Sequence, residues 1–189
     1  MNNGFPEKKI VDAVKTAYPA GCTVVLDEMH DPFREMPAGL KGTVVAVDDI
    51  GTVHVSWENG SSLGVAYGVD RIHRVYKNTK VTYLYRDASN YKTWNEVVLK
   101  GTITPEQVDT ILSFCEGKES FIPEQIGWPL LRDWDVTEDD HCFGELNKDG
   151  FEPTDKEATV DMTVEEAVAK FKAVNRHWDC DTYAPVVEY

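Results

Sequence analysis

Hydrophobic and polar residues alternate with a period of two through much of the first half of the chain. The alternation is cleanest at Val53, Val55 and Trp57, which a β-strand places on one face. Further short strands, separated by turn residues, are predicted over residues 23–26, 43–47, 62–67 and 71–75. Five short strands within about 55 residues predict a small β-barrel that is closed or nearly closed.

A period of 3.6 predicts three helices outside this region. Ile10 and Val14 share one face of a short helix that begins near Pro6, a residue suited to the first helical turn. Two further helices are predicted over residues 104–115 and 163–174. Each of them begins with capping-box spacing, in which a Thr is followed three residues later by Gln or Glu.

A polar connector, Lys77-Asn78-Thr79-Lys80, predicts a division into domains 1–78 and 79–189. After it, strands over residues 81–85 and 94–99 form a β-hairpin that precedes the two later helices. The predicted fold class is therefore α+β. A short N-terminal helix plus a small SH3-like five-stranded β-barrel is followed by an acidic α+β domain with a β-hairpin and two helices.

Acidic charge is concentrated in the second half. The chain has 189 residues and a formal net charge of −14. Residues 1–80 carry 9 Lys and Arg against 10 Asp and Glu, a net charge of −1, whereas residues 81–189 carry 10 against 23, a net charge of −13. Such a field repels nucleic acid and attracts basic protein surfaces. We therefore expect a host protein with a basic surface as the partner, and direct nucleic-acid binding is disfavoured.

Several classes of protein are disfavoured by features that the sequence lacks. No apolar run approaches the roughly 20 residues that span a bilayer, and the N-terminus lacks the pattern of a signal peptide. The four cysteines are widely spaced, with no C-x-x-C pair: Cys22, Cys115, Cys142 and Cys180. We expect a protein of the bacterial host cytoplasm with no membrane association, metal or cofactor.

The first half resembles known sequence patterns. Residues 37–44 resemble the G-x-x-G-x-V entry strand of SH3-like barrels. The wider pattern resembles an uncharacterised family, the domain of unknown function 4314, over about 55 residues. The matching segments are Asp31-Pro32, Gly42-Thr43-Val44, Val53-His54-Val55-Ser56-Trp57, Asn59-Gly60-Ser61-Ser62-Leu63 and Gly68-Val69-Asp70. SH3-like barrels host many unrelated functions, so this resemblance implies a fold and no particular activity.

The second half resembles an uncharacterised family of small proteins from Firmicutes genomes and their mobile elements. The shared segments are Tyr85-Arg86-Asp87-Ala88, Asn90-Tyr91-Lys92, Gly127-Trp128-Pro129, Asp140-His141-Cys142-Phe143 and Pro153-Thr154. The resemblance implies a phage or mobile-element accessory protein, and it brings no established activity with it.

The carboxylates between residues 133 and 149 are the candidate partner-binding groups. They are Asp133, Asp135, Glu138, Asp139, Asp140, Glu145 and Asp149. Their order lacks the glycine and terminal glutamate of a calcium-binding EF-hand loop, so a solvated acidic loop is favoured over a cation site.

A small-ligand site and an aromatic groove are further candidates. The hairpin turn offers Arg86 and Lys92 for a phosphate and Tyr91 for stacking. The whole candidate set is Arg86, Asp87, Asn90, Tyr91, Lys92 and His141. In the barrel, an aromatic groove for a peptide would be lined by Phe33, Trp57 and Tyr67. Trp57 alternates with Val53 and Val55, however, and this alternation favours a core position for it.

Three functions follow from these patterns. The preferred hypothesis is a non-enzymatic protein-binding factor of a phage or mobile element. It would be an anti-defence, anti-CRISPR-like inhibitor whose acidic surface occupies a basic nucleic-acid-binding site. One alternative is a small nucleotide-binding or hydrolytic enzyme that uses the region of Arg86, Asp87 and Lys92 together with His141 and Cys142. The other alternative is a nucleic-acid or ribonucleoprotein adaptor that binds through the barrel.

Overall fold

The computed structural model describes residues 6–186 and forms two compact units, of which the first ends at Tyr76 and the second begins at Lys77. The predicted division, between residues 78 and 79, lies close to this point. Each unit has its own hydrophobic core.

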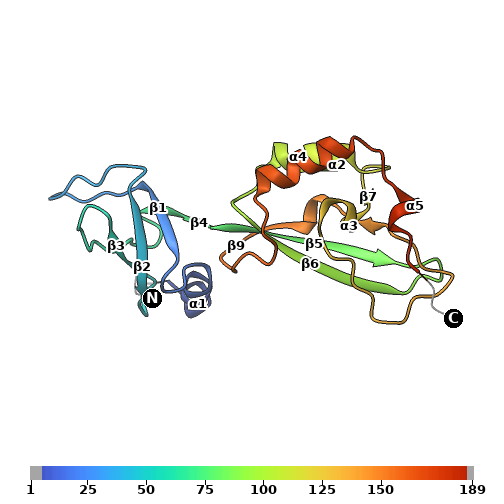
Figure 1. Ribbon diagram of the computed structural model, residues 1–189. Helices are drawn as coiled ribbons and strands as arrows, with labels where there is room; N and C mark the ends of the chain where they lie inside the picture. The colour runs from blue at the N-terminus through green and yellow to red at the C-terminus, as the bar shows by residue number, and fades with distance from the viewer. Residues whose placement is uncertain (1–5, 187–189) are drawn as a thin grey trace. The chain divides into compact units, whose positions relative to one another are not determined.

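The first unit consists of one helix and a four-stranded antiparallel sheet (Figure 1). Its elements are α1 (Lys8–Ala17), β1 (Thr23–Glu28), β2 (Lys41–Val47), β3 (Val53–Trp57) and β4 (Arg71–Val75). The strands pair in the order β3-β2-β1-β4. In β3, Val53, Val55 and Trp57 are buried while the two residues between them are exposed, which confirms the predicted alternation.

The predicted closed barrel is not found: within residues 6–76 no pairing joins β3 to β4, and the sheet is open. Instead of a fifth strand, residues 62–67 contribute a single bridge between Val65 and Val53. The chain turns away after this bridge, because Asp70 Oδ2 accepts the backbone N–H of Ala66 at 2.8 Å. The Ala66 carbonyl also accepts the N–H of Val69 and of Asp70, at 3.2 and 3.0 Å. Side-chain capping of this kind competes with strand pairing.

A glycine permits the close packing of β2 against β3. Gly42 occupies an inward position of β2 and is buried under its neighbours from β3. A Cβ atom at this position would lie 2.4 Å from Val55 Cγ1 and 2.8 Å from Trp57 Cε3. The space that a side chain would need is therefore filled by the valine and by the indole ring.

The second unit combines a five-stranded antiparallel sheet with helices. Its elements are β5 (Asn78–Arg86), β6 (Lys92–Lys100), α2 (Pro105–Phe114), β7 (Ser120–Phe121), α3 (Pro123–Ile126), β8 (Gly144–Glu145), the 3-10 helix η1 (Lys148–Gly150), β9 (Phe151–Thr154), α4 (Val164–Val174) and α5 (Cys180–Tyr183). The strands pair in the order β6-β5-β8-β7, and β9 pairs with the first half of β5. The predicted hairpin and both predicted helices are present.

Both capping boxes are confirmed. At the start of α2 the hydroxyl of Thr104 accepts the N–H of Gln107, and at the start of α4 the hydroxyl of Thr163 accepts that of Glu166. In return, a side-chain oxygen of Gln107 accepts the backbone N–H of Thr104, and one of Glu166 accepts that of Thr163. These bonds satisfy amide groups that the first helical turn leaves without partners.

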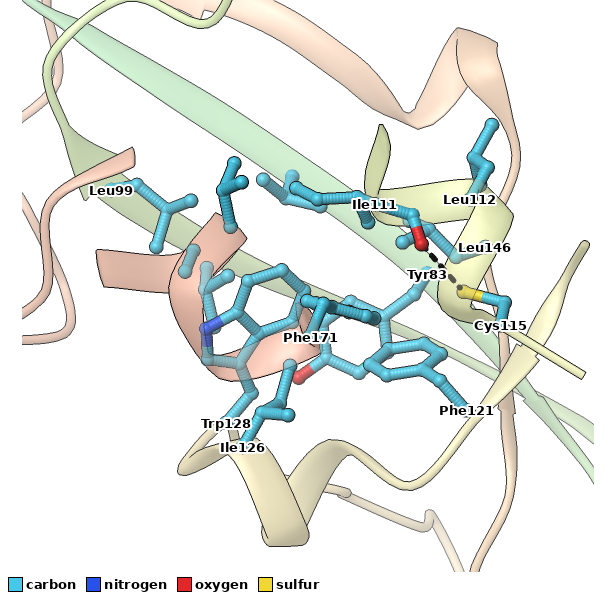
Figure 2. Close-up of a cluster of buried hydrophobic side chains, with 14 of the residues drawn as sticks. Tyr83, Leu99, Ile111, Leu112, Cys115, Phe121, Ile126, Trp128, Leu146 and Phe171 are labelled. Atoms are coloured by element: carbon cyan, nitrogen blue, oxygen red, sulfur yellow. Dashed lines mark hydrogen bonds between the residues drawn. The ribbon is translucent and has the colours of Figure 1, made fainter. Parts of the chain in front are cut away.

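Helices α2 and α4 lie side by side over one face of the β5–β6 hairpin (Figure 1). The core beneath them is aromatic: Phe121 lies within 6 Å, centroid to centroid, of the rings of Tyr83, Trp128 and Phe171 (Figure 2). All four side chains are less than 2% exposed. Such a core is closely packed and holds the strands of the sheet in place. The loops at the ends of these strands are therefore attached to a well-packed sheet.

Candidate functional site

Two segments that are far apart in sequence meet at one end of the second unit's sheet. The first is the hairpin turn, residues 87–91, which joins β5 to β6. The second is the acidic loop, residues 131–141, which has no regular secondary structure. The N–H of Ala88 donates to the carbonyl of Asp139 at 3.0 Å, and Ser89 Oγ donates to Asp139 Oδ2 at 2.6 Å. Thr93 Oγ1 donates to Asp133 Oδ2 at 3.0 Å. The acidic loop is thus fastened to the hairpin at several points.

The carboxylate of Asp140 is the central anchor of the acidic loop. It accepts a short hydrogen bond from the Tyr85 hydroxyl, the Thr137 N–H at 2.8 Å and the Trp134 indole N–H at 3.4 Å. Its side chain has no exposed surface. Burial by itself raises the pKa of Asp140, but the hydrogen bonds from Tyr85 and Thr137 outweigh burial and hold that pKa below its usual value.

Arg132 supplies the positive charge beside this anchor. Its Nε lies 3.4 Å from Asp140 Oδ1, which is ion-pair distance without hydrogen-bond geometry, and Nη2 donates to the carbonyl of His141 at 2.8 Å. The guanidinium stacks over the ring of Tyr85, 4.6 Å from the centroid. An aromatic ring and a carboxylate therefore enclose the arginine, whose side chain is 12% exposed.

A pocket of about 250 Å³ opens between the hairpin turn and the acidic loop. We call it the hairpin pocket. Its lining residues are Asp87, Ser89, Tyr91, Trp134, Thr137 and Asp139. The rings of Tyr91 and Trp134 lie 5.9 Å apart between centroids, at 58°, and form an aromatic corner. The pocket thus combines two aromatic faces with two carboxylate side chains.

The candidate partner-binding carboxylates do not share one environment. Most of them are exposed, namely Asp133, Asp135, Glu138, Asp139 and Asp149. The side chain of Asp140 is buried, so its charge forms contacts within the protein and is not available to a partner. Glu145 is half-buried in β8 and forms an ion pair with Arg86, Oε1 to Nε, at 3.0 Å.

The candidate ligand residues separate into two groups. Asp87 and Tyr91 line the hairpin pocket, whereas Arg86 bonds to Glu145 and, through Nη1, to Asn90 at 3.0 Å. Arg86 follows Tyr85 in β5 and therefore points to the opposite face of the sheet. His141 packs against Tyr85, with ring centroids 5.3 Å apart, and does not line the hairpin pocket. The side chain of Lys92 is exposed at the start of β6.

Cys142, the neighbour of His141, is a protonated thiol at neutral pH. The side chain is buried, and burial, with a smaller contribution from Cys180, raises its pKa to about 11. A thiol with such a pKa is a poor nucleophile at neutral pH because the thiolate is the reactive species. Nowhere in residues 6–186 do three or more His, Cys, Asp or Glu side chains gather in a way that would hold a metal ion.

The predicted aromatic groove of the first unit does not form as proposed. Trp57 is only 3% exposed, and its indole N–H donates to the carbonyl of Leu63 at 2.9 Å, so it belongs to the core. Phe33 is 91% exposed and Tyr67 is 52% exposed. The core position of Trp57 follows from its inward register in β3, opposite Gly42.

Sequence reasoning named Asp87 and Tyr91 but missed the residues that complete their pocket. Trp134 and Thr137 come from the acidic loop, about 45 positions further along the chain. One signal was present, since Trp134 stands between Asp133 and Asp135 as a large aromatic residue within an otherwise acidic run. An aromatic residue in such a run is more often packed than solvated.

The fold and this site define a two-unit α+β protein with an acidic, aromatic pocket in its second unit. Residues 7–75, essentially the first unit, match the family described as "Domain of unknown function (DUF4314)". The first unit is thus a DUF4314 domain. No curated protein and no solved structure matches the chain. None of the described helices is both long enough and apolar enough to cross a membrane.

Proposed function

We propose that this protein is a non-enzymatic binding factor whose acidic loop occupies a basic, nucleic-acid-binding surface of another protein. One observation carries the proposal: the exposed carboxylates of the acidic loop are held in place by the buried Asp140 anchor. Preorganised charges lose less conformational freedom on binding than charges on a mobile chain. They also steer a basic partner toward the surface.

The two arginines near the acidic loop do not cancel this field, because each is already paired. Arg132 faces Asp140, and Arg86 faces Glu145. The side chains of Asp133, Asp135 and Asp139 are exposed beside the hairpin turn and present negative charge there. The net charge of −13 over residues 81–189 extends that surface field.

The finer form of the proposal is an anti-defence inhibitor from a phage or mobile element. An anti-CRISPR-like protein that replaces nucleic acid on a host effector would need fixed carboxylates of this kind. This form is motivated by the sequence pattern of the second half, which we expect to belong with mobile-element proteins; the family match covers only residues 7–75. The first unit, with its SH3-like sequence pattern, would then serve as a structural or docking module.

The chemistry of the hairpin pocket argues against the nucleotide-binding alternative. Asp87 and Asp139 line the pocket and would repel a phosphate. Arg86, the cation proposed to hold that phosphate, is engaged by Glu145. The Cys142 thiol, with its raised pKa, does not supply a ready nucleophile.

The proposal is tested by capture of host proteins at low salt with the full chain as bait. Asp133→Asn, Asp135→Asn and Glu138→Gln together remove three exposed charges from the acidic loop. A control with Glu116→Gln, Glu119→Gln and Glu157→Gln removes the same charge from exposed positions outside the acidic loop. We expect capture of a basic protein that moderate salt or excess duplex DNA or RNA releases.

The two variants decide between a specific surface and general acidity. Loss of capture by the first variant, with retention by the control, supports the proposal. Equal loss in both variants means that overall charge alone attracts the partner. Capture that neither salt nor nucleic acid reverses would refute the proposed competition for a nucleic-acid-binding surface.

A further inference from the structure

We infer that the hairpin pocket receives an arginine side chain of the partner protein. This inference rests on the proposed function and specifies how the acidic loop recognises its partner. An arginine that contacts nucleic acid in the free partner would insert its guanidinium between the aromatic corner and the pocket carboxylates.

The aromatic corner favours an organic cation over a metal ion. The faces of Tyr91 and Trp134 carry negative π density, which attracts a guanidinium stacked on them. Tyr91 is 66% exposed, so its ring is accessible without any rearrangement of the chain. A hard divalent cation prefers several oxygen ligands, and the pocket instead offers two rings and two carboxylates.

Asp87 contributes a second carboxylate to the pocket. The residue is only 7% exposed, yet no Lys or Arg in the described part of the chain forms an ion pair with it. Its Oδ1 accepts the N–H of Tyr91 at 2.8 Å. No described group donates a hydrogen bond to Oδ2, and the residue lines the pocket. A guanidinium in the pocket would supply both a positive charge and hydrogen-bond donors for this carboxylate.

The protein already contains the proposed arrangement once. Arg132 stacks on Tyr85 with 4.6 Å from the guanidinium carbon to the ring centroid, and it lies beside the carboxylate of Asp140. Trp134 contacts both sites, since its ring lies 6.0 Å from that of Tyr85 and 5.9 Å from that of Tyr91. The hairpin pocket repeats the combination of ring and carboxylate on the accessible side of Trp134, without an internal arginine.

The test titrates the full-length protein with the tripeptide acetyl-Gly-Arg-Gly-amide and follows the indole N–H signal of Trp134 by NMR. The matched probe replaces arginine with citrulline, which has nearly the same shape and no charge. We expect saturable binding of the arginine peptide, and binding of the citrulline peptide that is weaker by about tenfold. The corresponding lysine peptide should also bind more weakly, because an ammonium neither stacks nor forms a bidentate pair.

Two substitutions and a control locate the binding. Tyr91→Ala removes one exposed ring and should weaken binding by about fivefold. Asp87→Asn keeps an acceptor for the Tyr91 N–H but removes the charge, and it should weaken binding by about tenfold. Trp94→Ala removes a ring that is similarly exposed, at 65%, outside the pocket, and it should leave binding unchanged.

Several outcomes would overturn the inference. If the citrulline peptide binds as tightly as the arginine peptide, or if Asp87→Asn has no effect, the attraction between the guanidinium charge and the pocket carboxylates does not drive binding. Equal affinity for the lysine peptide would refute the assignment to a guanidinium. Capture of a host protein that is insensitive to both pocket substitutions leaves the proposed function standing and removes the pocket from it. If the arginine peptide binds but no host protein is captured, the pocket keeps its arginine-binding role and the proposed function is refuted.

Discussion

Removal of the Asp140 carboxylate should destabilise the acidic loop more than any other single charge change in it. Asp140→Ala leaves the buried hydroxyl of Tyr85 without its acceptor and the Arg132 guanidinium without its counter-ion. Breaking a buried ion pair by removing one partner costs about 3–5 kcal/mol. Arg132 keeps its hydrogen bond to the carbonyl of His141 and its stacking on Tyr85, so we expect a loss of about 3 kcal/mol.

Two matched substitutions separate the contributions to this loss. Asp140→Asn keeps one acceptor oxygen but replaces the other, which also accepts hydrogen bonds, with an NH2 donor, so its expected cost is about 2 kcal/mol. Asp135→Ala removes an exposed carboxylate from the same loop and should cost less than about 0.5 kcal/mol. Arg132→Met, combined with Asp140→Ala in a double-mutant cycle, should give a coupling free energy of about 1–3 kcal/mol.

Urea denaturation followed by tryptophan fluorescence measures the free energy of unfolding of these variants. Hydrogen exchange at the N–H groups of Thr137 and Ala88 reports the acidic loop alone, because the bonds of both depend on the loop. If Asp140→Ala changes stability and exchange no more than Asp135→Ala does, or if the coupling is near zero, Asp140 does not anchor the loop.

Three further predictions follow from the same contacts. The pKa of Asp140 is lower in the folded protein than its usual value, so its stabilising effect should be fully present above about pH 4. That effect should be lost as the pH falls through the depressed folded pKa, with exchange at the acidic loop accelerating only in that range. Gly42→Ala should destabilise the first unit by about 1–3 kcal/mol in urea denaturation, because the new methyl group overlaps Val55 and Trp57; an unchanged midpoint would contradict that packing. Under native conditions iodoacetamide should modify the exposed Cys180 first, since the other three cysteines are buried, and mass spectrometry that finds all four modified at equal rates would contradict this burial.

Local patterns predicted the elements whose contacts are close in sequence. The alternation in β3 placed Trp57 correctly on the inward face, and the capping boxes placed the starts of α2 and α4. Such signals succeed because a strand's period and a helix's first turn depend on neighbouring residues. The short strand β9 was missed, since its pairing with the start of β5 joins residues about 75 positions apart.

The closed barrel was predicted wrongly for a related reason. Leu63, Val65 and Tyr67 alternate as in a strand, but the carboxylate of Asp70 accepts the N–H of Ala66 and turns the chain there. A turn built by one side chain several residues away leaves no trace in an alternation pattern. The family pattern over residues 7–75 was nevertheless recognisable from the sequence, since it depends on residue types and spacing.

The sequence by itself determined the acidic charge of the second half, the hairpin, and the presence of Asp87 and Tyr91 in its turn. Only the tertiary structure decided what each carboxylate does. Asp139 and Asp140 are adjacent and chemically identical, yet one is exposed beside the hairpin pocket and the other is a buried anchor. The difference comes from Tyr85, which lies 55 positions away in β5 and donates its hydroxyl hydrogen bond to Asp140. That contact is made by the packing of distant segments, and no local pattern encodes it.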